Sequence, residues 1–306
     1  GGVASAQAYP VKPIRLIDSF GAGGTDDFLL RLLGSKMSEI YKSPVVVENR
    51  PGAGGAVSQV YVAKSPPDGY TLLMVAGGDI VIAPWLYKAL TIKPVEELAP
   101  VFNVAEAPQL LLVPASLPAK TVQEFIAYAK ANAGKLNYGS SGPGSSPHLA
   151  AELFASMAGI KMTHIPYKGV ALYVTAQIGN EIQFAFSNMF TTMPHWKAGR
   201  LRLVATGGLK RMEAMPELPT IAESGVPGFE ALTWYGYLAP AKTPRAIVDK
   251  LQKEIAAIVN TPEVRQNFIA QGNEPLANKP DEFGKVMKND ADKWGAIGKK
   301  LGVKLD

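Results

Sequence analysis

The chain has 306 residues, of which 47% are hydrophobic and 19% charged, and its formal net charge is +5. This length and apolar content suffice for a large core and favour two lobes over one. Because the chain has no cysteine, disulfides, thiol catalysis and thiolate metal sites are excluded. The lysines and arginines are scattered, without a basic patch interleaved with aromatic residues, so the sequence does not indicate nucleic-acid binding. The histidines, His148, His164 and His195, lack the spacing of a metal-binding helix, and we expect neither a metal nor another cofactor.

The N-terminal residues carry a pattern typical of an export signal. Ala6-Gln7-Ala8 before Tyr9 has the small-x-small form of a signal-peptidase site, without the charged and apolar regions that precede such a site. We therefore expect an exported protein whose signal peptide is mostly removed; the alternative is an ordinary flexible, Ala-rich terminus. A long apolar stretch over residues 70–87 is interrupted by glycines, an aspartate and a proline, which argues against a membrane span.

A strand, a Gly-rich turn and a helix are expected where the fold begins. Residues 14–19 favour a strand, residues 20–24 a turn, and the apolar spacing after them a helix that Thr25 can cap. Neither the G-x-G-x-x-G spacing of a dinucleotide site nor the Gly-Lys-Ser/Thr of a P-loop is present. Asp26 and Asp27 have a structural explanation as first-turn acids that the helix dipole stabilises.

Strands and helices continue to alternate after this unit. Residues 44–48 and 70–75 are expected strands, with a helix over residues 57–63 between them. Such alternation predicts an open, mostly parallel sheet, and ligands of such sheets bind beyond the carboxyl ends of the strands. Residues 20–27 and 76–79 both follow a strand, so we expect them to line one cleft.

The second part of the chain repeats the pattern and ends in helices. Strands are expected over residues 109–114, 136–138, 161–165, 181–186, 201–206 and 232–239, and helices over about 121–132, from 147, after 169, around 194–198, and over 247–259, 263–270 and 280–301. This layout predicts two α/β lobes, residues 1–110 with 236–306 and residues 111–235, joined by two crossing strands near 110–113 and 234–238. Such proteins commonly close on a ligand by hinge motion.

The stretch from Asn137 to Leu149 is rich in Gly and Ser and joins a strand to a helix. Ser146 stands where an N-cap belongs, and Pro147 suits the first helical position. Free backbone N–H groups and the positive end of the helix dipole make such a helix start a seat for a carboxylate or phosphate. The plainer alternative is a cap that binds nothing. Because two loops of this kind would converge between the lobes, we predict a small anionic ligand there.

Motifs that follow one order along nearly the whole chain resemble those of a known family. They are Tyr9-Pro10, Pro13-Ile14-Arg15, Phe20, Gly23-Gly24 with Asp27 and Arg31, Val-Val-Val-Glu-Asn-Arg-Pro-Gly-Ala-Gly-Gly at 45–55, Pro-Asp-Gly-Tyr-Thr-Leu-Leu at 67–73, Lys-Leu-Asn-Tyr at 135–138, the glycines and serines of 142–146 with His148, His-Ile-Pro-Tyr-Lys-Gly at 164–169, Lys-Ala-Gly at 197–199, Pro219-Thr220 and Gly225. In these motifs the chain resembles the substrate-binding proteins of tripartite tricarboxylate transporters, also called the Bug family.

The resemblance implies a type II-like periplasmic-binding-protein fold, the Venus flytrap, with two mixed, mostly parallel sheets flanked by helices. It implies a periplasmic receptor, not an enzyme, that binds a small carboxylate between its lobes and delivers it to membrane permease subunits. The ligand would be a di- or tricarboxylate, an aromatic carboxylate or an amino acid, and we expect a monomer. Family members hold the carboxylate mainly with backbone amides, hydroxyls and bridging waters, and neither Gly-rich loop here contains an arginine.

Three positions depart from the common pattern of the family. Ser187 stands where aspartate is frequent, Asp79 stands where a small hydroxyl residue is usual, and Asp26 adds an acid beside Asp27. An acid in the cleft would repel a ligand carboxylate by roughly 1–4 kcal/mol at contact. Asp79 therefore either meets an ammonium or ring nitrogen of the ligand or lies outside the cleft.

We expect the ligand site to draw on both lobes. Phe20 would pack on the apolar body of the ligand, while backbone amides of the first loop and serine hydroxyls of the second bind its carboxylate. Three residues, Ser187, Asn188 and Asp79, are expected to tune selectivity. The predicted ligand-binding residues are Phe20, Ala22, Gly23, Gly24, Asp27, Gly77, Asp79, Ser140, Ser141, Ser145, Ser146, Ser187 and Asn188.

Two other functions fit parts of the sequence. A serine hydrolase would need a nucleophile, an oriented base and an oxyanion site. Ser146 and His148 are too close in sequence for the first two roles, and no G-x-S-x-G elbow is present. The same fold could also serve as an extracytoplasmic sensor that presents its ligand to a two-component system, a role that these residues do not distinguish from transport.

Overall fold

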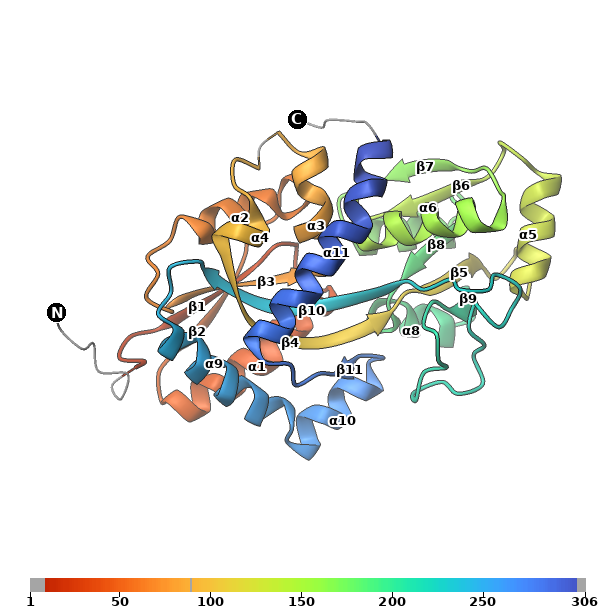
Figure 1. Ribbon diagram of the computed structural model, residues 1–306. Coiled ribbons are helices and arrows are strands. Elements are labelled where there is room, and N and C mark those ends of the chain that lie inside the picture. Colours follow the sequence, from red (N-terminus) through yellow and green to blue (C-terminus); the bar gives the residue numbers. More distant parts are fainter. Residues whose placement is uncertain (1–8, 89, 302–306) are drawn as a thin grey trace.

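The computed structural model describes residues 9–88 and 90–301, with the side chains of 293 and 296–301 left aside. The small-x-small segment over residues 6–8 lies outside the described residues, so the expected signal-peptidase site stays a prediction. Two mixed β-sheets with helices packed on them form the two halves of the molecule (Figure 1).

Parallel pairs hold together the strands that the alternating pattern predicts. The strand order is β11-β4-β10-β3-β1-β2 in the first sheet and β7-β6-β8-β5-β9 in the second. In the first sheet β1 (Ile14–Asp18) lies parallel to β2 (Val45–Asn49) and β3 (Thr71–Ala76). In the second sheet β6 (Asn137–Ser140) lies parallel to β7 (Thr163–Pro166) and β8 (Phe184–Ser187).

Antiparallel pairs arise where the chain passes between the two sheets. The strand β4 (Leu98–Pro108) continues through Gln109 into β5 (Leu110–Pro114), and β10 (Leu232–Pro240) returns beside β4 (Figure 1). In the described part of the chain every antiparallel strand pair involves β4, β5 or β10; the other partners are β3, β8, β9 (Leu201–Thr206) and β11 (Glu274–Pro275). The sheets are therefore mixed, as expected, but they are not mostly parallel: among the described strands four pairs are parallel and five antiparallel, because the strands that pass between the sheets pair antiparallel with their neighbours.

The helices divide between the sheets in the same way. We call the first sheet with α1–α4 and α9–α11 lobe 1, and the second sheet with α5–α8 lobe 2; the chain boundaries at residues 110 and 235 stay a prediction. The helices are α1 (Thr25–Tyr41), α2 (Ala56–Ala63), α3 (Gly77–Leu86), α4 (Pro94–Glu97), α5 (Val122–Ala131), α6 (Ser146–Ala158), α7 (Val170–Ile178), α8 (Met189–Lys197), α9 (Arg245–Val259), α10 (Pro262–Ala270) and α11 (Pro280–Leu301), with a short 3-10 turn, η2 (Ala53–Gly55), before α2.

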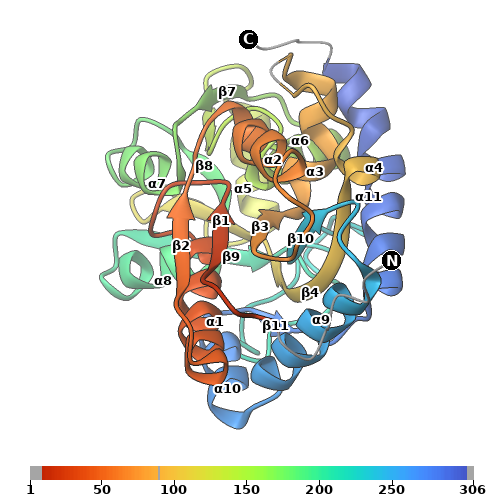
Figure 2. The same ribbon diagram turned by 90° about the vertical axis from the view of Figure 1, so that its left-hand side faces the viewer.

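Apolar stripes on the helices of lobe 1 cover its sheet. Leu30 of α1 and Leu251 of α9 are buried in one cluster with Leu16 of β1. In a second cluster, Ile80 of α3 and Phe283 of α11 are buried with strand residues of the same sheet. The C-terminal helices thus return to lobe 1, where α9 and α11 lie beside the first sheet (Figure 2).

An aromatic cluster forms the core of lobe 2. Phe125 of α5 and Phe154 of α6 meet Phe184 of β8 with ring centroids 5.1 and 5.6 Å away. Phe186 and Phe229 extend the cluster. Aromatic pairs of this kind add about 0.5–1.5 kcal/mol each beyond the burial of their area. The cluster therefore holds α6, and with it the start of that helix, firmly on the second sheet.

Some elements differ from what the sequence predicts. The sequence predicts residues 77–79 only as a segment that follows a strand, yet they begin α3, and Pro84 lies inside this helix. The burial of α3 against the first sheet outweighs its weak helix propensity. The sequence does not predict β4, because Pro100, Asn103 and Pro108 are poor strand residues; pairing with β10 and β11 compensates.

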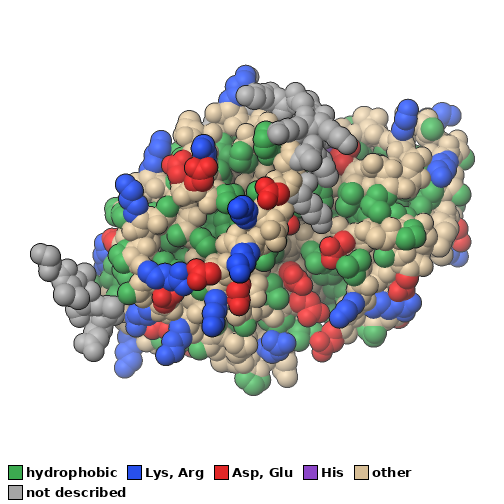
Figure 3. Space-filling view, viewed as in Figure 1, with side chains coloured by type: hydrophobic (Ala, Val, Ile, Leu, Met, Phe, Trp, Pro, Cys, Tyr) green, Lys and Arg blue, Asp and Glu red, His purple; other side chains and the backbone are tan. Residues whose placement is uncertain are grey.

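The surface carries mixed charge. On the face seen in Figure 1, Lys and Arg side chains lie singly or in small groups among Asp and Glu, with apolar side chains between them (Figure 3). Among the helices that the structure describes, none has the length and apolar character that crossing a membrane requires.

Candidate functional site

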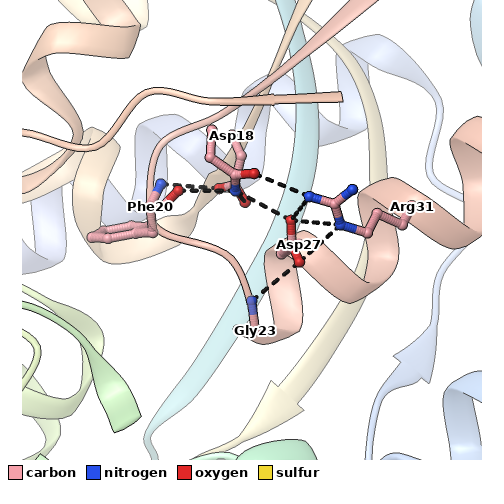
Figure 4. A network of polar contacts seen from close by, with 6 residues as sticks. Asp18, Phe20, Gly23, Asp27 and Arg31 are labelled. Atoms are coloured by element: carbon pink, nitrogen blue, oxygen red, sulfur yellow. Dashed lines mark hydrogen bonds and ion pairs between the residues drawn. The ribbon is translucent and has the colours of Figure 1, made fainter. Parts of the chain in front are cut away.

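The Gly-rich turn between β1 and α1 is held by acidic side chains beneath it. The Phe20 amide donates to Asp18 Oδ1 at 3.0 Å, and the Gly23 amide donates to Asp27 Oδ2 at 3.1 Å (Figure 4). Asn49 Nδ2 bridges the two acids, at 2.8 Å from Asp18 and 3.1 Å from Asp27. The turn is therefore fixed before any ligand arrives, and one of the three amides predicted to bind the ligand, that of Gly23, is already in use.

Asp27 is committed to this turn. Arg31, four residues later on α1, forms an ion pair with it at 2.9 Å, while the Asp27 side chain is 8% exposed. Burial acts to raise the pKa of Asp27, but hydrogen bonds from Arg31, Gly23 and Asn49 outweigh it and lower the pKa below its ordinary value. Asp27 thus stays ionised and supports the loop. Both of its carboxylate oxygens already accept hydrogen bonds from within the protein, and its contact with the ligand stays a prediction.

Two further acids next to this turn have no such cation. Asp18 at the end of β1 and Asp26 in the first turn of α1 are both buried. Burial and the neighbouring Asp26 carboxylate raise the pKa of Asp18 to about 10, and burial raises that of Asp26. The expected cap of α1 does not form: the N-cap is Gly24, and Thr25 is the first helical residue. Lobe 1 therefore presents a buried, weakly compensated acidic region beside its Gly-rich turn.

Asp79 lies on the other strand-end segment of lobe 1. It stands in the first turn of α3, is 4% exposed, and its Oδ2 has no hydrogen-bond partner among the described residues. Burial and the charge of Asp26 raise its pKa well above the ordinary value, although a hydrogen bond from the Ala76 amide acts the other way. Gly77, also predicted to contact the ligand, packs against Trp234, since an added Cβ would lie 2.5 Å from the indole nitrogen, and its contact with the ligand stays a prediction.

The Gly/Ser loop of lobe 2 is supported by two histidines. The Gly144 amide donates to His148 Nδ1 at 2.9 Å, and Ser140 Oγ lies 2.7 Å from His164 Nε2. The two imidazoles stack with centroids 4.1 Å apart, and Tyr138 extends the stack at 4.9 Å from His164. Burial lowers the pKa of His148 to about 4 and, together with the charge of His148, that of His164 to about 3. Both rings are neutral at physiological pH and can act as acceptors in these contacts.

The start of α6 differs in detail from the sequence prediction. The N-cap is Ser145 rather than Ser146, and its hydroxyl donates to the Gly142 carbonyl at 2.7 Å instead of capping the helix. Ser146 is the first residue of α6 and is partly exposed. Its amide and hydroxyl face α3, because an added Cβ at Gly78 would lie 3.0 Å from Ser146 N and 2.9 Å from its Oγ.

A small cavity lies where these segments meet. Its volume is about 10 Å³, the room of roughly one water molecule. The lining residues are Phe20, Gly54, Asp79, Ala83 and Tyr87 from lobe 1 and Ser141, Pro143, Gly144 and Ser145 from lobe 2. Two contacts join the lobes: Tyr87, which lines the cavity, donates to the Pro143 carbonyl at 2.9 Å, and Phe28 of α1 stacks on Phe190 of α8 with ring centroids 4.9 Å apart. The lobes thus lie close together around polar groups from both sides.

The structure brings only part of the predicted set to this cavity. Phe20, Asp79, Ser141 and Ser145 line it, and Ser146 lies beside it. Ala22 and Gly23 are exposed on the turn, and Gly24 is partly exposed at the N-cap of α1.

Three other predicted residues are engaged elsewhere. Ser140 contacts His164, Ser187 is buried with the Tyr173 hydroxyl 2.9 Å from its Oγ, and Asn188 caps α8 by accepting from the Thr191 amide at 3.2 Å. Ser140 and Ser187 therefore shape the loops that carry the site. Their predicted contact with a ligand stays a prediction.

Five lining residues were not in the predicted set: Gly54, Ala83, Tyr87, Pro143 and Gly144. Gly54 and Gly144 stand in motifs that the sequence marks as turns. Glycine has no side chain, so at both positions it would let the backbone of the turn approach a ligand closely. Ala83 belongs to α3 and Tyr87 is the C-cap residue of that helix, which the sequence does not predict. The positions on α3 that face lobe 2 could not be assigned for that reason.

A second, larger cavity of about 510 Å³ lies elsewhere, along the β11 edge of the first sheet. Glu106, Glu230 and Glu274 line it, together with Leu209 and Leu232. Lys210 and Arg211 line it as well, among four glutamates, but neither Gly-rich loop nor the start of α6 reaches it. Among the described residues, no group of three or more His, Asp or Glu side chains could hold a metal ion.

Comparison with known proteins identifies the family. The sequence matches the family model described as tripartite tricarboxylate transporter family receptor over residues 29–303. The chain belongs to this family. It is 36% identical over 300 residues to a UPF0065 protein of Cupriavidus necator, with 98% of this chain and 90% of that protein covered. It is 32% identical over 302 residues to the protein BugT of Bordetella pertussis, with 98% and 93% covered.

Solved structures of similar proteins have the same fold. R. palustris Rpa4515 with adipate superposes with a TM-score of 0.92 at 33% identity, covering 97% of this chain and 99% of that one. The periplasmic binding protein BugD gives a TM-score of 0.88 at 32% identity, covering 97% and 99%. MatC from Rhodopseudomonas palustris with bound malate gives 0.87 at 26% identity, covering 95% and 100%.

Membership in this family confirms the resemblance seen in the sequence. The chain has the two-lobed fold of the Bug periplasmic binding proteins and is a solute receptor of a tripartite tricarboxylate-type transporter. The family is one of solute-binding receptors, not of enzymes. Similar proteins are periplasmic by their own descriptions.

Proposed function

We propose that this receptor binds a small organic carboxylate in the cavity between its lobes and, as a periplasmic monomer without catalytic activity, passes it to membrane permease subunits. The observation that carries the proposal is the meeting of the start of α6 with α3 around this cavity. The adipate and malate bound to Rpa4515 and MatC support a carboxylate as the ligand.

Groups of lobe 2 offer hydrogen bonds to an anion. The Ser146 amide belongs to the first turn of α6, where backbone N–H groups lack intrahelical partners and the helix dipole favours negative charge. Ser141 and Ser145 line the cavity, and the Ser146 hydroxyl lies on the same segment. The Ser145 hydroxyl donates to the Gly142 carbonyl, so it would have to exchange that bond for one to the ligand. A carboxylate with its charge spread over two oxygens matches this set of donors.

Entry of the ligand requires the lobes to move apart, since a cavity of about 10 Å³ admits no metabolite. The two crossings, from β4 into β5 and from β9 to β10, are where such a motion would bend the chain. The proposed division at residues 110 and 235 falls at the start of β5 and inside β10, close to these two crossings. Ligand held by both lobes would then favour, by population shift, a closed arrangement that is wider than the present one by the room the ligand needs.

A thermal-shift screen tests the proposal. The protein, unfolded, stripped of ligand and refolded, is screened against C4–C6 dicarboxylates, citrate, aromatic carboxylates and amino acids. A ligand at 100 times its Kd adds about 2.7 kcal/mol, which for a chain of this size raises Tm by about 4 °C. Folded protein that shifts with none of these would refute a small carboxylate as the ligand.

The serines of α6 provide the matching variant. Replacing both Ser145 and Ser146 by alanine removes two hydroxyls near the cavity, and we expect affinity for the ligand to fall by about 1–3 kcal/mol, since each can bond a charged group. Ser156→Ala, lower on the same helix, is the control and should leave affinity unchanged. A double variant that keeps full affinity by calorimetry would remove these hydroxyls from the site.

A further inference from the structure

The cavity between the lobes is lined by a buried acidic side chain with no cation beside it among the described residues. This residue, Asp79, is only 4% exposed, and its Oδ2 has no hydrogen-bond partner in the described part of the chain. None of the described residues that line the cavity is a lysine or an arginine. A buried polar atom without a hydrogen-bond partner is unfavourable, and a buried ionised carboxylate is more so, unless a group from outside the folded chain bonds to it.

The arginines nearest in sequence to the site are bound to other acids. Arg31 pairs with Asp27 at 2.9 Å, and Arg50 pairs with Glu48 at 3.1 Å. Asp26, from α1, adds a second negative group whose charge acts on Asp79. The other titratable groups that interact with Asp79 are the hydroxyls of Tyr87 and Tyr235, from the end of α3 and from β10. The surroundings of Asp79 thus hold acids and phenols, and they favour a positive charge at its free oxygen.

A helix-capping role accounts for only half of this side chain. Asp79 stands in the first turn of α3, where an acid is stabilised by the helix dipole, and the Ala76 amide is its backbone donor. This explains one oxygen. It does not explain why the other oxygen, on a residue that lines the cavity between the lobes, is buried without a partner among the described residues.

We propose that Asp79 binds an ammonium group of the ligand while the Ser141–Ser146 loop binds its carboxylate, so that the receptor selects amino acids or other ammonium-bearing carboxylates. The two ends of the cavity are then complementary to the two charges of a zwitterion. A dicarboxylate without the amine would place like charges together at Asp79, which the low dielectric of the cavity makes unfavourable. Asp26 strengthens the field but does not line the cavity. This inference rests on the proposed function.

Matched ligand pairs test it on the full chain. Calorimetry compares succinate with aspartate, glutarate with glutamate, and adipate with 2-aminoadipate, so each pair differs by one amine. We expect the aminated member of the best pair to bind about 10- to 100-fold more tightly, the range of a hydrogen bond to a charged group. Asp79→Asn, which keeps the size of the side chain, should bring the two members close to parity.

Two further variants make the result decisive. Asp79→Ser keeps an oxygen that can cap α3 and should also abolish the preference. Asp281→Asn removes a first-turn acid from α11, on an exposed surface, and should keep the preference of the wild type. A wild-type protein that prefers the member without the amine, or an Asp79→Asn variant that keeps the preference for the amine, overturns the inference. If no carboxylate of either kind binds, the proposed function itself fails.

Discussion

Closure of the lobes depends on a glycine in α3. A Cβ added at Gly78 would lie 2.9 Å from Ser146 Oγ, 3.0 Å from Ser146 N and 3.4 Å from the Gly144 carbonyl oxygen. These three nearest atoms all belong to the loop and helix start of lobe 2. A methyl group at residue 78 would therefore oppose the close arrangement of the lobes and leave lobe 1 by itself undisturbed.

The magnitude of the effect follows from these distances. Favourable contacts between such atoms need about 3.5–4.0 Å, so the lobes of a Gly78→Ala variant would have to separate by roughly 0.5 Å or more. Overpacking of this kind costs about 1–3 kcal/mol, which weakens the affinity of a ligand held by both lobes by about 5- to 150-fold. In the separated form the change is mildly favourable, because alanine exceeds glycine in helix propensity by up to about 1 kcal/mol.

Calorimetry and urea unfolding measure the two sides of this prediction. We expect Gly78→Ala to lose affinity for the carboxylate that the thermal-shift screen returns while its ligand-free stability stays equal or rises. Gly284→Ala is the control, since it lies in α11 with its nearest neighbour, Pro100 Cγ, at 3.4 Å. It should match the change in stability and keep the affinity. Full affinity in a folded Gly78→Ala protein would refute closure of α3 onto α6 as a requirement for binding.

Three further predictions concern single side chains around the cavity. Tyr87→Phe removes the hydrogen bond to the Pro143 carbonyl across the lobes, and calorimetry should show an affinity loss of about 0.5–1.5 kcal/mol with little change in stability; an unchanged Kd would mean that this bond does not favour closure. Burial lowers the pKa values of His148 and His164 to about 4 and 3, so the folded state binds fewer protons than the unfolded state. The free energy of unfolding should therefore be highest above pH 6.5 and fall below that pH by about 1.4 kcal/mol per pH unit for each ring. His148→Gln keeps an acceptor for the Gly144 amide and should flatten this part of a urea-unfolding pH profile, whereas an identical slope would exclude His148 as its source. Asp79 should act in the opposite sense. Because its pKa is raised in the folded protein, the wild type should lose stability as pH rises above 3.8, by up to about 1.4 kcal/mol per pH unit, and Asp79→Asn should remove this loss. A variant profile parallel to that of the wild type would contradict this.

The sequence predicts well those parts of the fold whose pattern is local. The helix over 280–301 has the predicted bounds, and the strand at 201–206 does as well, because periodic apolar residues and nearby prolines or glycines mark them. By contrast, α3 could not be recognised, because what makes residues 77–86 helical is their burial between the first sheet and α11, not their composition.

The candidate site shows the same limit. The sequence singles out both loops correctly as the segments that meet at the cavity, since a helix start after a Gly-rich turn is a local feature. Its prediction that Ser140 and Ser187 bind the ligand stays a prediction; in the structure their hydroxyls contact His164 and Tyr173, which lie 24 and 14 residues away in the chain. Whether a serine is free to bind a ligand depends on such partners, and no local pattern reveals them.

Asp27 and Asp79 of lobe 1 illustrate how hydrogen-bond partners give the same residue type two different roles. Asp27 has Arg31, two backbone or amide donors and a depressed pKa, so it stays ionised and stabilises the Gly-rich turn. Asp79 has a buried oxygen without a partner and a raised pKa, so it contributes nothing comparable to the fold. Folding alone favours an uncharged residue at such a position. The position of Asp79 in the cavity that both lobes share is therefore better explained by what it binds than by what it stabilises.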